Sequence, residues 1–198
     1  MTTPPAPNRW LAIAFAIAAA GCLAAAALTP YWVVNNNVYD KLHFGLRAMS
    51  HCGSAFGEGE CDRSSNAAFI DHMRDFSAVA GRETSGAFAA MGWATFALCV
   101  VAALGLVIAA AIAIARKRPD LPMAPTTLAL LSIMVALVTG CVFVATKPGP
   151  PGFVGVGLSF WLFGIGEVLG LAGSTLLAKV NRPPDPDLME GAMDPDEF

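Results

Sequence analysis

Four long apolar stretches dominate the pattern of hydrophobic and polar positions. They run over residues 10–28, 86–115, 126–145 and 153–178, and only the last contains a charged side chain. At about 1.5 Å of rise per residue, the first stretch spans roughly 28 Å, which matches the hydrocarbon core of a bilayer. Backbone groups in lipid must find hydrogen bonds within their own segment, so each stretch is predicted to be a transmembrane helix. The pattern therefore predicts an all-α membrane protein built on a four-helix bundle.

The segment over residues 30–85 separates the first two stretches and is polar enough to face water. Short runs of β-favouring residues around Asn35-Asn36-Asn37 predict a small sheet. After Ser64-Ser65-Asn66, a plausible N-cap, apolar residues recur at helical spacing and predict a short amphipathic helix. These apolar residues are Phe69, Met73, Phe76 and Ala80. Residues 1–182 then form one membrane domain, and the Pro-rich acidic tail over 183–198 is predicted to be disordered.

Composition narrows the class of protein further. Hydrophobic residues make up 56% of the chain and charged residues 14%, against about 25% charged residues in soluble domains. The net charge of −3 provides no electrostatic footprint for nucleic acid. We therefore expect membrane lipid around the helices, and no nucleic-acid partner.

Charge near the helix ends predicts the orientation. Six Lys and Arg residues fall on each side of the predicted membrane. On the side that holds both termini, five of the six lie within one turn of a helix end, where the positive-inside bias acts. This predicts a multi-pass protein of the plasma (inner) membrane with both termini in the cytoplasm and the 30–85 loop outside.

Cysteines agree with this orientation. Cys52 and Cys61 lie in the polar loop among glycines, and a disulfide between them needs an oxidising compartment. Two unpaired surface thiols are the alternative. Cys22, Cys99 and Cys141 lie within apolar stretches and are predicted to fill space in helices. Alternatively, residues 9–22 are a lipoprotein signal with Cys22 acylated, although the apolar run continues to residue 28.

The loop also resembles a known family. Trp32 is followed by Gly45-Leu46, Cys52, Cys61 and, before the second apolar stretch, Arg82. This order is similar to that of the claudin superfamily. The fourth stretch, through Gly157-Leu158-Ser159-Phe160-Trp161 and Gly166-Glu167-Val168-Leu169-Gly170, resembles the stargazin branch, which regulates glutamate receptor channels. Arg47 stands where the family's second Trp is found.

The resemblance implies a left-handed four-helix bundle that supports a small antiparallel sheet. Cys52–Cys61 would staple that sheet, and Trp32 and Leu46 would anchor it at the membrane surface. Alternatively, Trp32 is an interfacial belt residue like Trp10 and Trp161. The connection between the third and fourth helices is only a few residues long, too short for a second adhesive loop of the claudin type.

Glu167 is the charged side chain within the fourth stretch. A carboxylate there costs at least about 2.5–3.5 kcal/mol on insertion scales, so it is expected to face the bundle or to be protonated. It borders a stripe of small residues, Gly166, Gly170 and Ser174, which favours close helix contact. Glu167 is either a proton or cation site, a group that bonds to a partner's helix, or a neutral group bonded within the bundle. The candidate bonding partners inside the bundle are Thr95, Ser132 and Thr139.

Catalytic and metal-binding patterns are weak in comparison. The loop holds His43, His51 and His72 with Asp71 and Asp75, but a zinc site needs three or four converging ligands. No metal, cofactor or catalytic residue is predicted, and the protein is not expected to be an enzyme. The main hypothesis is a non-catalytic, claudin-like membrane protein that contacts another integral membrane protein or itself. The alternatives are a small proton- or cation-coupled transporter subunit that uses Glu167, and a membrane thiol redox enzyme.

Overall fold

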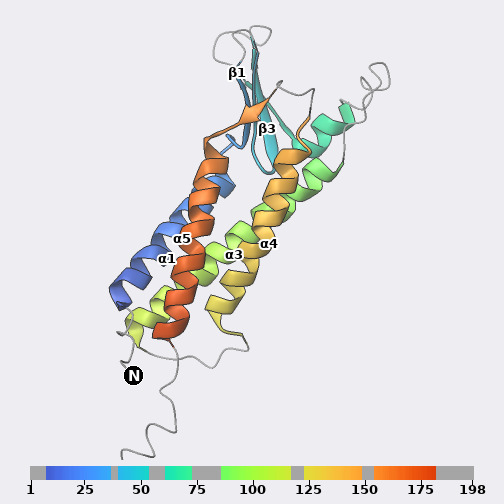
Figure 1. Cartoon of the computed structure of the whole chain (residues 1–198). Helices are drawn as coiled ribbons and strands as arrows, with labels where there is room; N and C mark the ends of the chain where they lie inside the picture. The colour runs from blue at the N-terminus through green and yellow to red at the C-terminus, as the bar shows by residue number, and fades with distance from the viewer. Residues whose placement is uncertain are drawn as a thin grey trace, which may run out of the picture.

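The computed structural model describes residues 8–36, 40–53, 61–72, 86–116, 123–148 and 154–181. Its main body is a bundle of the helices α1 (Arg9–Leu28), α3 (Ala87–Ala115), α4 (Pro125–Ala145) and α5 (Leu158–Val180). In Figure 1, α1 lies beside α5 and α3 beside α4, and α1–α3 and α4–α5 contacts close the bundle. By length and composition, all four helices can cross a membrane.

Local sequence explains where several helices begin and end. The Asn8 side chain accepts hydrogen bonds from the N–H groups of Trp10 and Leu11 and so caps α1. Pro125 occupies the first turn of α4, where its missing N–H costs nothing. At the end of α3, Arg116 adopts the left-handed conformation, with a φ of 53°. The predicted starts of the first three helices each differ from the observed ones by one residue.

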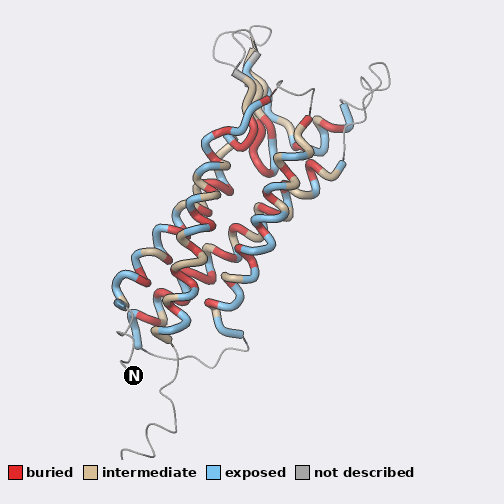
Figure 2. Tube along the Cα trace, in the orientation of Figure 1, coloured by how far each residue is buried: buried red, intermediate tan, exposed pale blue. Residues whose placement is uncertain are grey.

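Small residues are frequent inside the bundle, whereas large apolar residues occur both inside it and on its outer surface. Figure 2 shows buried positions along the sides of the helices that face one another. In α1 these positions are mostly alanines, among them Ala12, Ala16 and Ala19. Large hydrophobic side chains such as Val138 and Val168 remain exposed on the outside of the bundle.

A five-stranded antiparallel sheet stands at one end of the bundle (Figure 1). Its strands are β1 (Val33–Asn36), β2 (Asp40–Phe44), β3 (Ala48–Gly53), β4 (Cys61–Ser65) and β5 (Gly155–Val156), in the order β4-β3-β2-β1-β5. A helix begins at residue 66 directly after β4, and the Ser65 hydroxyl accepts a hydrogen bond from the N–H of Ala68. The predicted sheet and the start of the predicted helix are therefore confirmed, whereas Met73, Phe76 and Ala80 lie outside the described residues.

The start of the fourth helix was predicted wrongly. Instead of helix from Phe153, residues 155–156 form β5, which pairs with Val33 and Val34 of β1. Gly157 follows, and its N–H donates to the carbonyl of Trp32 at 2.9 Å. A Cβ on Gly157 would overlap the carbonyl oxygen of Tyr31, so this close approach requires glycine. The helix starts only at Leu158 because the preceding backbone is bonded to the sheet.

Candidate functional site

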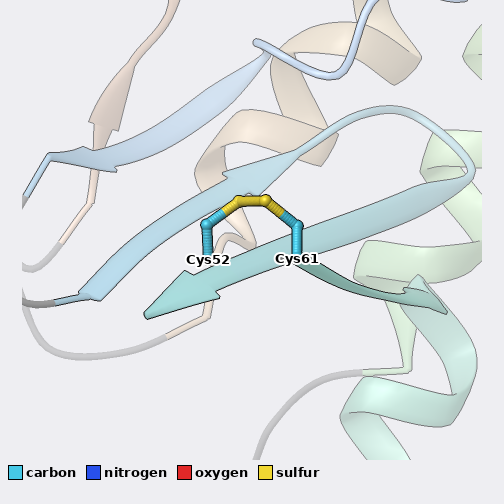
Figure 3. Close-up of a disulfide and its surroundings, with 2 residues drawn as sticks. All are labelled: Cys52 and Cys61. Atoms are coloured by element: carbon cyan, nitrogen blue, oxygen red, sulfur yellow. A yellow bond between two sulfur atoms is a disulfide. The ribbon is translucent and has the colours of Figure 1, made fainter. Parts of the chain in front are cut away.

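The disulfide joins the two outermost strands on one side of the sheet (Figure 3). Cys52 of β3 and Cys61 of β4 are directly opposite in the register, with their Cα atoms 4.2 Å apart. The predicted bridge is therefore confirmed, and the alternative of two unpaired thiols is wrong. Of the two residues, Cys61 is exposed and Cys52 is half-buried, so the bridge ties an exposed edge strand to the sheet.

Trp32 joins the sheet to the bundle. It is 0% exposed, and its indole N–H donates to the carbonyl of Ala26 in the last turn of α1 at 2.6 Å. Its ring meets Phe143 of α4 and Phe163 of α5 at centroid distances of 5.8 and 5.0 Å. A belt residue would face the lipid headgroups, so the alternative assignment of Trp32 to an interfacial belt is wrong.

The Gly45-Leu46 pair forms a second junction between sheet and bundle. The backbone of Leu46 packs so closely on α3 that a Cβ on Gly92 would overlap the Leu46 carbonyl oxygen. Asn66, which is completely buried, donates its side-chain N–H to the carbonyls of Gly45 and Leu46 at 2.9 and 3.2 Å. A Cβ on Gly45 would lie 3.1 Å from Cα of Pro30. The turn between β2 and β3 therefore contacts α3, Asn66 and the chain that follows α1.

Arg47 stands where the resemblance to claudins would place a second Trp, and it makes an aromatic contact of its own. Its guanidinium carbon lies 4.2 Å from the ring centroid of Phe96 and 5.8 Å from that of Trp93, both on α3. Cation–π attraction of this kind holds an arginine flat against an aromatic face. Arg82, the last residue of the resemblance, lies outside the described residues.

No family model matches this chain, and no curated protein does.

Glu167 is a carboxyl group buried inside the bundle. It is 3% exposed, and neither carboxylate oxygen has a partner among the described residues. Thr95 and Thr139, two of the predicted partners, bond to each other at 2.9 Å. The predicted hydrogen bond from Glu167 to Thr95, Ser132 or Thr139 is therefore not present. The expectation that Glu167 faces the bundle is met.

The stripe of small residues beside Glu167 also faces inward. A Cβ on Gly166 would lie 3.0 Å from Leu23 of α1, and one on Gly170 would lie 2.6 Å from Cδ1 of Ile133 on α4. Ser174 is buried as well. Sequence reasoning missed Gly173, where a Cβ would lie 2.9 Å from the backbone nitrogen of Ala16. The sequence feature that could have indicated this contact is the alanine repeat of α1, because small side chains let the backbones of α1 and α5 approach closely.

The histidines of the loop do not form a cluster. Within the described ranges, no group of three or more His, Cys, Asp and Glu residues is placed to hold a metal ion, and Asp75 lies outside them. His43 packs edge-on against Tyr31 at 5.1 Å. Partial burial, and next the Lys41 ammonium, lower the pKa of His43 from its ordinary value of 6.5. His43 therefore belongs to the packing of the sheet against the chain that leaves α1.

Three residues that hold the sheet against the bundle could not be singled out from the sequence, namely Asn66, Gly92 and Gly157. Each also has an ordinary local explanation: Asn66 as a helix cap, Gly92 as a glycine within a helix, and Gly157 as the residue before a helix. Only their contacts with residues far along the chain, such as Asn66 with Gly45, reveal their function. Together with Trp32 they make the sheet a fixed extension of the bundle.

Proposed function

We propose that the chain is a multi-pass protein of the plasma (inner) membrane, with both termini in the cytoplasm and the sheet outside. The four apolar helices support it, since their outward faces carry large apolar side chains that suit lipid. The disulfide supports the placement of the sheet in an oxidising compartment. Arg9 and Arg116, at the opposite end, support a cytoplasmic position for that end through the positive-inside bias.

Within that membrane, its proposed role is non-catalytic and of the claudin type: it contacts another integral membrane protein or a second copy of itself. The observation that carries this proposal is the fixed junction of sheet and bundle around Trp32. A sheet held in this way presents its exposed side chains at a constant height and angle, which lowers the ordering cost of binding a partner. Asp62 on the edge strand β4 is an exposed residue for such a contact.

Photo-crosslinking tests this role in the membranes of cells that make the protein. A photoreactive residue at Asp62 on β4 should form an adduct with one defined protein, whose mass separates a second copy from another partner. The matched control is the exposed Val138 on α4, where the adducts should be lipid. Replacing Cys52 and Cys61 by serine should remove the Asp62 adduct, since the edge strand loses its tie. Absence of any protein adduct at Asp62 in folded protein would overturn the proposal.

A second candidate function rests on Glu167, whose carboxylate has no hydrogen-bond partner among the described residues. A buried carboxylate with no hydrogen-bond partner is costly, and groups of this kind inside membranes often belong to proton or cation pathways. We propose as the alternative a small proton- or cation-coupled transporter subunit that uses Glu167. Purified protein in liposomes decides between the two: a coupled transporter loses its flux in Glu167→Gln, whereas a contact protein shows no flux and tolerates the change.

A further inference from the structure

A groove of about 400 Å³ lies where the end of α1 meets the sheet. Its apolar wall comes from the last turn of α1 and the residues that follow, including Leu28 and Pro30. Its other wall comes from the β2–β3 turn, β3 and β4, where the polar residues Arg47, Ser50 and Arg63 alternate with apolar ones such as Leu46 and Met49. The bundle side of the groove is apolar apart from Thr29, and both of its cationic side chains come from the sheet side.

The charge of the groove has one sign. Arg47 and Arg63 are the two charged residues among its described lining residues, none of which is Asp or Glu. The neighbouring acid, Asp62, lies on the opposite face of the sheet from Arg63, because successive residues of a strand alternate in direction. With two guanidinium groups and no carboxylate among its described lining residues, the groove attracts an anion.

The position of Arg47 is held by its contacts with α3. Its guanidinium packs against Phe96 and Trp93, and Trp93 is 52% exposed on the outside of the bundle. Indole rings prefer the boundary between hydrocarbon and headgroups. Leu28, 68% exposed at the end of α1, lies along the apolar wall. Both features place the groove at that boundary if the chain spans a membrane as proposed above.

We propose that this groove binds an anionic phospholipid of the leaflet on the sheet side. The headgroup phosphate lies between Arg47 and Arg63, since guanidinium groups match phosphate oxygens in charge and in hydrogen-bond geometry. The glycerol and the first part of an acyl chain lie along Leu28 and Pro30. A bound lipid of this kind fixes the height of the sheet above the bilayer, and the inference rests on the proposed membrane orientation.

The test is lipid binding by the purified full chain in detergent, with titration followed by native mass spectrometry. The probes are phosphatidylglycerol, phosphatidylcholine and inorganic phosphate. We expect retention of phosphatidylglycerol, and at least about tenfold weaker binding in Arg47→Gln and in Arg63→Gln, since each change removes charge-assisted hydrogen bonds to the phosphate. The matched control is Lys41→Gln, which removes a cation from the same face of the sheet outside the groove and should leave binding unchanged.

Three results would overturn the inference. Equal binding of phosphatidylcholine would remove the requirement for an anionic lipid, and equal competition by inorganic phosphate would reduce the groove to a simple anion site. An equal loss in Lys41→Gln would show that only general surface charge matters. An intact Cys52–Cys61 bridge and an unchanged elution volume establish that each variant is folded. Because the purified chain is measured without any partner, this result is independent of the Asp62 crosslinking that tests the proposed function.

Discussion

The contact between α5 and its neighbours at Gly170 makes a strong prediction about stability. Replacing Gly170 by Leu places a Cβ 2.6 Å from Cδ1 of Ile133, and 3.7 Å from the Cβ of Ala19. Carbon atoms in good contact lie about 3.5–4.0 Å apart, so Ile133 or the helix must move by about 1 Å before the rest of the leucine is placed. Overpacking of this kind typically costs about 1–3 kcal/mol. For a chain of this size, that corresponds to a melting temperature lower by roughly 2–12 °C.

Gly164 on the same helix provides the matched control, because a Cβ there would meet nothing within 4 Å. Both Gly→Leu changes improve helix propensity by a similar amount, so the difference between them isolates the packing term. The assay is recovery of monodisperse monomer after heating in detergent. Ile133→Ala opens space at the contact, and combined with Gly170→Leu it should cost less than the sum of the two single changes, with a coupling of about 0.5–3 kcal/mol.

Two outcomes would refute this reasoning. If Gly170→Leu and Gly164→Leu have the same thermal stability, the stripe does not carry the contact between the helices. If the Gly170→Leu monomer is as stable as the parent and only a co-purifying subunit or oligomer is lost, the stripe faces a partner rather than α1 and α4. In either case, the assignment of Glu167 to the interior of the bundle would fall as well, because it borders the same face.

The remaining predictions concern the sheet and the orientation. Replacing Cys52 and Cys61 together by serine should lower the free energy of unfolding by roughly 2–4 kcal/mol relative to the oxidised parent, as measured by denaturant titration. The reduced parent is the control and should show the same loss. The lowered pKa of His43 means that the folded protein binds a proton on this imidazole less readily than the unfolded chain does. The contribution of the neutral imidazole to folding stability is therefore present above about pH 6.5 and is lost as the pH falls through the lowered pKa. Thermal melting of His43→Gln should therefore depend less on pH below 6.5, and an unchanged profile would contradict it. An impermeant thiol reagent should label Val156→Cys from outside the cell and Arg116→Cys only after the membrane is opened; outside labelling of position 116 would reverse the proposed topology.

The sequence alone determined the helices, because the signal for them is local. A long uncharged stretch can satisfy its backbone in lipid only as a helix, and the four predicted helices therefore agree with α1, α3, α4 and α5 to within a residue or two, except at the start of α5. The pairing of Cys52 with Cys61 was also within reach, since both lie in one short polar loop. The internal stripe on α5 was visible as a four-residue repeat, although what it faces was not.

Tertiary structure alone decided the contacts between segments far apart in the chain. Gly155 and Gly157 weaken a helix at this point, but they do not select a strand; residues 155–156 form one because β1 offers an unpaired edge beside them. In the same way, Asn66 reads as a helix cap until the carbonyls of Gly45 and Leu46 are placed next to it. Glu167 lies on α5, which packs against α1, α3 and α4, so its surroundings come from distant parts of the sequence. Hydropathy is a property of each segment, whereas a hydrogen bond or a close backbone contact belongs to a pair, and only the folded chain specifies which pairs meet.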